Sequence, residues 1–270
     1  MEGRRIVKQA LGAVDRLRPT RSGVTVLIYH RVGGRSGSEV DLDVEVFRAQ
    51  LEHLRREHEV ISLDEAAVRL GSEPGDGDDR SAVVITVDDG TADFSEHLVP
   101  ALIGADLPAT LYVATSFVET GTPFPWGAPP LTWADIRDAT STGLVTIGSH
   151  THTHRLLDRA EPTIVDDELD RSIELIGEHL GAAPRHFAYP KAVPGSSTAA
   201  AAVRRRFDTA AIAGSRVNRP GSTDLHALAR TPVQRNDGLD FFAMKAAGGG
   251  RTEGDIRALL ARVKYRRSTT

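Results

Sequence analysis

The amino-acid sequence predicts an α/β protein, a distorted or incomplete (β/α) barrel of about seven parallel strands. About six or seven apolar, β-branched runs alternate with segments of helical periodicity along the 270 residues. Acidic and imidazole side chains directly follow several of these runs, and α/β barrels place their active sites at such carboxyl ends of strands. The sequence contains neither Gly-x-Gly-x-x-Gly nor Gly-x4-Gly-Lys-Ser/Thr, so nucleotide-binding folds lose support.

Each predicted strand is a short apolar run that turn residues bound on both sides. A Gly/Ser-rich loop over residues 31–43 follows the first strand, and Pro, Gly and Asp mark surface loops at 71–80 and 121–130. The strands are predicted at residues 24–30, 60–63, 82–87, 109–114, 144–148, 187–189, 208–213 and 228–233.

The helices between the strands carry apolar residues at helical spacing. Ser62 or Asp64 is expected to cap the helix over 64–70, and Gly181 is expected to end the long helix over 161–180. The other helices are predicted around residues 47–54, near 94–104, near 132–140 and over 196–206.

Residues 1–22 are predicted to be an N-terminal extension and residues 23–270 to form one domain. Residues 4–18 have the pattern of a basic amphipathic helix, which either packs on the domain or makes peripheral contact with an anionic membrane surface. No apolar run is long enough for a secretory signal or a transmembrane span, so a cytoplasmic location is expected. The basic residues near the C-terminus are expected to form a solvated helix end: Arg262, Lys264, Arg266 and Arg267.

Composition narrows the range of functions. A formal net charge of −4 at pH 7 gives no support for a nucleic-acid partner. Cysteine is absent, so a disulfide framework is excluded and any bound metal must be held by nitrogen and oxygen atoms.

Two segments carry the candidate chemistry. Asp88 and Asp89 end the apolar run over 83–87, and histidines at 150, 152 and 154 follow the run over 144–147. In hydrolytic metal sites the protein commonly supplies one carboxylate and two imidazoles as ligands, and the other coordination positions stay open for water and substrate. The second carboxylate can stay off the metal and act as a base. The sequence therefore predicts a metal-dependent hydrolase.

These segments resemble the NodB-type polysaccharide deacetylases, carbohydrate esterase family 4. The family's Thr-Phe-Asp-Asp-Gly motif stands here as Thr-Val-Asp-Asp-Gly at 86–90, and its His-Ser/Thr-x-x-His motif stands at 150–154. Arg-His-Phe-Ala-Tyr-Pro at 185–190 and Leu-Ile-Tyr-His-Arg-Val at 27–32 resemble the Phe-Ala-Tyr-Pro branch. The resemblance runs from about residue 24 to about 245. It implies an N-acetylated oligo- or polysaccharide substrate, from whose amino sugars the 23–270 catalytic domain removes acetyl groups.

The resemblance further implies that Asp89, His150 and His154 bind a divalent metal and that Asp88 is the catalytic base. Two nitrogens, one carboxylate and open positions make Zn²⁺ the leading metal, and Co²⁺ or Ni²⁺ would suit the same ligands. His150 and His154 share a face if the chain turns helically after residue 149, and His152 is then expected to point elsewhere.

Two departures from the family concern the base and the acid. Ala188 stands where the family often has an arginine that orients the base, and Arg185 or Arg230 is the candidate for that guanidinium. Arg230 in turn stands where the family often has a general-acid histidine, for which His30 and His226 are the candidate replacements. If Arg230 takes over the arginine's role, its guanidinium should reach the Asp88 carboxylate from the end of a neighbouring strand.

Other residues are candidates for binding the substrate. Lys191 follows Tyr189 and Pro190 and replaces an aromatic residue whose backbone N–H helps to hold the oxyanion, a role that does not need the side chain. Sugars stack on aromatic faces, so Trp126 is a candidate wall of a glycan groove, whereas Trp133 is expected to be buried under its own helix.

Two alternative functions remain open at this point. The same metal site could hydrolyse O-acetyl esters or other C–N bonds, such as those of cyclic amides. The protein could also be a catalytically silent glycan-binding protein, although the intact Asp88 argues against that function.

Overall fold

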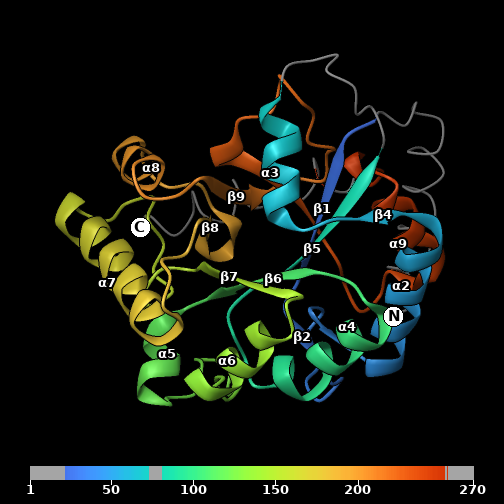
Figure 1. Cartoon of the computed structure of the whole chain (residues 1–270), viewed down its shortest axis with the longest axis horizontal. Coiled ribbons are helices and arrows are strands. Elements are labelled where there is room, and N and C mark those ends of the chain that lie inside the picture. The colour runs from blue at the N-terminus through green and yellow to red at the C-terminus, as the bar shows by residue number, and fades with distance from the viewer. Residues whose placement is uncertain (1–21, 73–80, 253, 255–270) are drawn as a thin grey trace, which may run out of the picture.

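The computed structural model describes residues 22–72, 81–252 and 254. Within these residues, parallel strands close into a barrel in the order in which they follow along the chain (Figure 1). The ring closes because β1 pairs with both β5 and β10. Its strands are β1 (Val24–Tyr29), β5 (Ala82–Val87), β6 (Ala109–Val113), β7 (Val145–Ser149), β8 (His186–Ala188), β9 (Thr209–Ala213) and β10 (Leu228–Pro232). The predicted fold class is confirmed.

The barrel is distorted between β7 and β8. These two strands share one pairing position, Ser149 with Phe187, whereas β6 and β7 pair over five positions. Three short strands lie outside the ring. β4 (Glu59–Val60) pairs with the start of β5, and β2 (Arg31–Val32) pairs with β3 (Asp41–Leu42) inside the predicted 31–43 loop.

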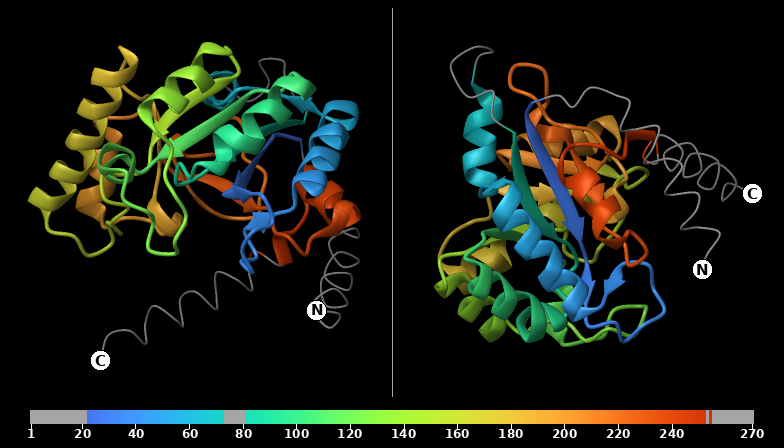
Figure 2. Two further views of the ribbon diagram at one scale, coloured as in Figure 1. Left: turned by 90° about the horizontal axis from the view of Figure 1, so that it is seen from below. Right: turned by 90° about the vertical axis from the view of Figure 1, so that its right-hand side faces the viewer.

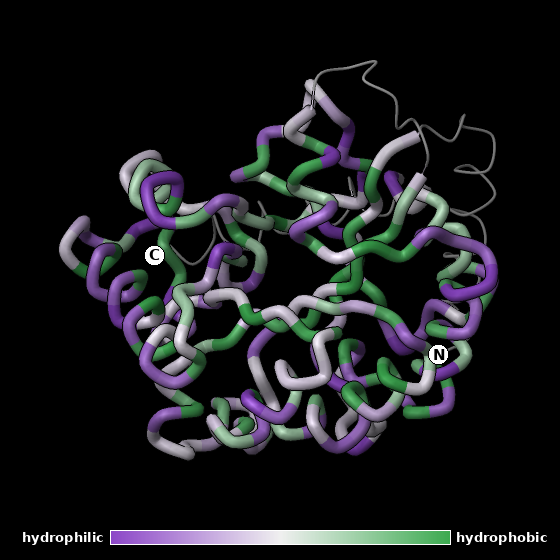
Figure 3. The backbone as a smooth tube through the Cα atoms, in the orientation of Figure 1, coloured by the Kyte–Doolittle hydropathy of each residue, from purple (hydrophilic) through white to green (hydrophobic). Residues whose placement is uncertain are grey.

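Helices surround the barrel on its outside (Figures 1 and 2). They are α2 (Val44–Glu57), α3 (Leu63–Gly71), α4 (Val99–Ala105), α5 (Thr115–Thr120), α6 (Trp133–Ser141), α7 (Pro162–Leu180), α8 (Ser197–Arg204) and α9 (Gly238–Ala246). Short helical turns are η1 (Phe94–Leu98), η2 (Pro190–Ala192) and η3 (Leu225–Ala227). Because the helices cover the outer face, every residue of β1 and of β5 is buried. Figure 3 shows the corresponding hydrophobic residues along the central strands.

The sequence signals at the helix ends act as predicted. The Ser62 hydroxyl accepts from Glu65 N while the Glu65 carboxylate accepts from Ser62 N, a capping box that starts α3. Gly181, with φ 77°, ends α7. The predicted 94–104 helix begins with the wider π-helical turn η1 before α4 continues it.

Some predictions differ from the structure or lie beyond it. Helix α9 was not predicted, and the strand expected at 60–63 is limited to β4 because Leu63 already belongs to α3. Among the described helices, none combines the length and the apolar character that crossing a membrane requires. The predicted 4–18 helix, the basic C-terminal residues and most of the 71–80 loop lie outside the described residues.

Candidate active site

A tight turn after β5 places Asp88 and Asp89 at the carboxyl end of the barrel. Asp88 N donates to the Tyr29 carbonyl at 3.0 Å, which continues the pairing of β5 with β1. Asp89 and Gly90 then take positive φ angles of 78° and 92°, so the chain leaves the strand direction at once. Such angles are uncommon outside glycine, although aspartate adopts them more readily than most residues. The turn lets the adjacent carboxylates reach different partners.

Asp88 forms a buried ion pair with Arg230, the contact predicted for these residues. The guanidinium nitrogens Nη1 and Nη2 donate to the two carboxylate oxygens at 2.6 and 2.9 Å, and Nη1 also donates to Thr86 Oγ1 at 3.2 Å. The Tyr112 ring lies against the guanidinium, 5.1 Å from its centroid to Cζ. Burial by itself would raise the pKa of Asp88, but the adjacent Arg230 charge outweighs it and lowers that pKa to about 2. Asp88 is therefore ionised.

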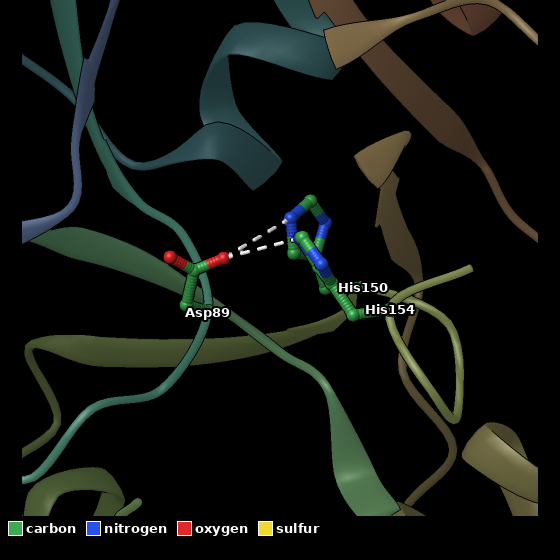
Figure 4. Close-up of side chains that lie close together, drawn as sticks. All are labelled: Asp89, His150 and His154. Atoms are coloured by element: carbon green, nitrogen blue, oxygen red, sulfur yellow. Dashed lines mark ion pairs between the residues drawn. The ribbon is translucent and has the colours of Figure 1, made fainter. Parts of the chain in front are cut away.

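Asp89 faces two imidazoles instead of a guanidinium. Its Oδ1 atom lies 3.7 Å from His150 Nε2 and 3.3 Å from His154 Nε2, and all three candidate ligand atoms lie within 4.8 Å of one another. Figure 4 shows both imidazoles directed toward the Asp89 carboxylate. Three residues from two separate loops thus present one oxygen and two nitrogen atoms to a common point.

This cluster fits a bound metal ion. Zinc–ligand bonds of about 2.0–2.1 Å in a tetrahedron separate the ligand atoms by about 3.3 Å, close to the distances found here. His150 Nδ1 donates to the Ala188 carbonyl at 2.8 Å, which leaves the Nε2 lone pair directed at the cluster. Burial lowers the pKa of His150 to about 4, so its ring is the neutral form that metal binding requires.

The chain that carries the histidines has an unexpected conformation. A helical turn after Ser149 was the condition considered for bringing His150 and His154 onto one face, but residues 150–154 form an irregular loop instead. In it, Thr151 and His154 have φ angles of 64° and 60°. These two left-handed residues bring the imidazoles of His150 and His154 together, with ring centroids 4.9 Å apart. His152 lies away from the cluster, as predicted, and its Nδ1 is hydrogen-bonded to Thr115 Oγ1 at 2.9 Å.

A cavity of about 380 Å³ opens beside the three candidate ligands. Trp126 is 45% exposed on its wall, stacks on the buried Phe124 ring and meets the His154 ring edge-on. Trp133 is buried and stacks on His179, so the burial predicted for it is confirmed. The described residues that line the cavity are His30, Arg31, Ser36, Ser38, Val40, Asp89, Trp126, His150, His154 and Lys191.

The two candidate acid histidines lie at opposite ends of the barrel. His30 directly follows β1 and lines the cavity, and its buried Nδ1 has no hydrogen-bond partner among the described residues. His226 lies in η3, before the first residue of β10, where Nε2 bonds to the Phe207 carbonyl at 2.8 Å. The structure therefore does not bring His226 to Asp88, because its position before β10 takes it to the amino end of the barrel.

Arg185 is also distant from the base. It precedes β8, its side chain is 64% exposed, and its guanidinium pairs with Asp208 and Asp64. Ala188, at the end of β8, is fully buried and contributes its carbonyl to His150. Of the two arginines considered for the missing guanidinium, only Arg230 contacts Asp88.

The segment after β8 contributes to the cavity through Lys191 alone. Lys191 and Ala192 have φ angles of 53° and 54°, and the Lys191 N–H has no hydrogen-bond acceptor in the described part of the chain. Tyr189 and Pro190 are buried and do not line the cavity, so the direct substrate contact predicted for them is not supported by their positions. They form the turn from which Lys191 reaches the cavity.

Sequence reasoning missed one wall of the cavity. Residues 31–43, predicted only as a Gly/Ser-rich loop, contribute Arg31, Ser36, Ser38 and Val40 to the lining. Buried carboxylates hold this segment: Asp93 accepts from Val32 N at 2.7 Å, and Asp41 accepts from the amides of residues 34 and 36. In the sequence, Asp41 and Asp93 each stand between two apolar residues, and this was the available signal.

Solved structures of other proteins share this fold. IcaB from Ammonifex degensii is 26% identical to the chain with a TM-score of 0.73, over 84% of this chain and 97% of that one. The Streptococcus pyogenes deacetylase PplD, in complex with acetate, is 21% identical with a TM-score of 0.73, over 84% and 99% of the two chains. A de-N-acetylase from Aggregatibacter actinomycetemcomitans is 19% identical with a TM-score of 0.68, over 82% and 99%. The last two, at these identities, support the fold alone.

The sequence itself also matches a family. No curated protein matches the chain significantly. The family model described as polysaccharide deacetylase matches residues 75–209, half of the chain. That segment contains Asp88 and Asp89 as well as the loop that carries His150 and His154. Together with the barrel, this match shows that the chain belongs to the polysaccharide deacetylase family, the NodB-type carbohydrate esterases of family 4.

Proposed function

We propose that this protein is a metal-dependent hydrolase that removes N-acetyl groups from an amino-sugar-containing glycan or glycan precursor. The observation that carries the proposal is the arrangement of two adjacent carboxylates, one on the cavity wall and one directly behind it with its own cation. Asp89 lies with two imidazoles in a geometry that suits a metal ion, and Asp88 is held ionised beside them by Arg230. Family membership supports an acetylated polysaccharide as the substrate.

Asp89, His150 and His154 are the residues that would hold the cation. A divalent cation at this point would polarise the acetyl carbonyl and increase the acidity of a nearby water molecule. The donor set of two imidazoles and one carboxylate favours Zn²⁺, with Co²⁺ and Ni²⁺ as alternatives.

Asp88 acts in this proposal as the general base. Its Oδ2 atom lies 3.9 Å from His150 Nε2, so the carboxylate borders the metal cluster while the Arg230 fork fixes its orientation. Asp88 accepts the proton of the water molecule that attacks the acetyl carbon. The Lys191 N–H, which has no acceptor among the described residues, donates to the oxygen that becomes negatively charged in the tetrahedral intermediate.

His30 completes the reaction as the general acid. When the C–N bond breaks, the leaving amine needs a proton, and His30 lies on the wall of the same cavity. Its position on the cavity wall favours His30 over His226 as the general acid. Trp126, 45% exposed on the cavity wall beside the candidate ligand His154, would stack against a sugar ring.

Acetate release is the experiment that tests this function. Zn²⁺-loaded protein should release acetate from N-acetylated amino-sugar oligosaccharides, and the Asp88→Asn variant should bind the same oligosaccharides without releasing acetate. Release of acetate from O-acetylated glycans alone would show that the substrate is an ester and not an N-acetyl amide. Glycan binding without release of acetate from either substrate would contradict a hydrolytic function.

A further inference from the structure

The loop over residues 150–154 needs an external restraint to present both imidazoles. Thr151 and His154 have left-handed backbones, a conformation that residues other than glycine hold only where the surrounding structure enforces it. Hydrogen bonds from this loop to two neighbouring elements supply part of that restraint. Ser116 N in α5 donates to the His152 carbonyl at 2.8 Å, and His152 N donates to the Glu168 carbonyl at 3.0 Å.

The two histidines of the cluster are held in different ways. His150 is fixed directly, because its Nδ1 donates to the Ala188 carbonyl and its side chain is only 1% exposed. His154 is 12% exposed, and its Nδ1 makes no hydrogen bond to the part of the chain that the structure describes. The direction of the His154 ring therefore depends on the backbone that carries it.

Glu168 is hydrogen-bonded to that backbone. It lies in the second turn of α7, is 6% exposed, and directs both carboxylate oxygens at Thr153, the residue before His154. Oε2 accepts from Thr153 N at 2.7 Å, and Oε1 accepts from the Thr153 hydroxyl. Arg155 Nε, 3.8 Å from Oε1, places a positive charge nearby. A buried carboxylate is costly unless it is hydrogen-bonded, so this arrangement commits Glu168 to the loop.

We propose that Glu168 is a positioning residue that holds the 150–154 loop through Thr153 and thereby directs His154 at the metal. The inference rests on the proposed function, because it presumes that Asp89, His150 and His154 bind a metal ion. Residues that orient metal ligands in this way typically change metal affinity by about 10- to 100-fold when they are removed.

The test measures Zn²⁺ affinity by competition with a chromophoric chelator, together with the visible spectrum of the Co²⁺-loaded protein. Glu168→Ala should weaken Zn²⁺ binding by about 10- to 100-fold and alter the Co²⁺ spectrum. Glu168→Gln should recover most of the affinity, because its amide oxygen can accept from Thr153 N and its NH₂ group can donate to the Thr153 hydroxyl. The control is Glu174→Ala, an exposed position on the same helix, which should bind Zn²⁺ like the unaltered protein.

Two further comparisons keep the result decisive. Thr153→Val removes only the hydroxyl contact and should weaken Zn²⁺ binding less than Glu168→Ala, and it serves as the test if Glu168→Ala does not fold. Equal Zn²⁺ affinity in the unaltered protein and in the folded Glu168→Ala and Thr153→Val variants would overturn the role of Glu168 alone. Failure of the unaltered protein to bind Zn²⁺ would instead contradict the proposed function.

Discussion

Asp88 and Asp89 follow the same strand and are both buried, yet one turn gives their carboxylates partners of different kinds. Asp88 has a permanent cation from the protein, the Arg230 guanidinium, on both of its oxygens. Asp89 faces two imidazoles, and burial keeps one of them, His150, in its neutral form. Two adjacent buried carboxylates can both stay ionised when each has its own cation. The protein supplies that cation for Asp88, and in the proposed function a metal ion supplies it for Asp89.

The largest effect is expected where the ligand set of Asp89 is broken. Protein purified without chelator should contain roughly one divalent ion per chain, and His154→Ala should lose most of it together with measurable turnover. Elemental analysis and acetate release check the two results. A variant that keeps its metal content would show that His154 is not a ligand.

Changing Asp88 should separate catalysis from metal binding. Asp88→Asn keeps the shape of the side chain but removes the base, so turnover should fall by about two to four orders of magnitude. Metal content should stay at the level of the unaltered protein, in contrast to His154→Ala. Turnover near that of the unaltered protein would exclude Asp88 as the base.

His30 and His226 form a matched pair of histidines for testing the acid. His30→Gln should lower turnover by about 100-fold, at the lower end of the range for a positioned proton donor. His226→Gln, at the other end of the barrel, should leave turnover unchanged. Equal turnover in the two variants would remove His30 from the mechanism.

Removing Arg230 tests how much the pairing of the buried Asp88 carboxylate with this guanidinium contributes to the stability of the protein. Arg230→Met leaves a buried carboxylate without its partner and should lower the free energy of unfolding by about 3–5 kcal/mol. The double variant Arg230→Met with Asp88→Asn should recover part of this loss, since the unpaired charge is then gone. Urea unfolding of the metal-free proteins measures both. No recovery in the double variant would indicate that packing of Arg230, and not the charge of Asp88, dominates.

The smallest effect concerns a histidine outside the site. His186, the first residue of β8, is fully buried, and burial lowers its pKa below the value of about 6.5 in the unfolded chain. The unfolded state therefore binds a proton more readily below that pH, so the contribution of His186 to stability is complete above about pH 6.5 and falls as the pH is lowered. His150 has the same sign of shift in metal-free protein, so His186→Gln should reduce the pH dependence of urea unfolding without abolishing it. An unchanged dependence would contradict the prediction.

The sequence predicted those site residues whose positions depend on where the strands end. Asp88, Asp89 and His150 directly follow apolar strands, and Arg230 was expected to reach Asp88 because both belong to strands of one barrel. Their placement follows from the alternation of strands and helices and from the parallel direction of the strands, and local sequence patterns are enough to predict both.

The parts that the sequence did not predict depend on contacts across the fold. Nothing local favours left-handed backbone at Thr151, a β-branched residue, and hydrogen bonds between the loop and both α5 and α7 help to enforce it. His226 was a candidate because it lies only four residues before Arg230 in the sequence. Those four residues run along the start of β10, however, so His226 lies toward the opposite end of the barrel. The wall at 31–43 was missed because its short strands have no apolar run of their own.

The single pairing position between β7 and β8 has a consequence for how the site is assembled. With one shared position, the backbone contributes little to keeping these strands adjacent, and side chains must contribute more. The His150 ring, which follows β7, is hydrogen-bonded to the carbonyl of Ala188 at the end of β8, and so it bridges the two strands where their pairing is weakest. The same imidazole directs its other nitrogen at Asp89 on the far side of β6. Closure of the barrel and formation of the candidate metal site therefore depend on each other, and a bound ion would stabilise both in one cooperative step.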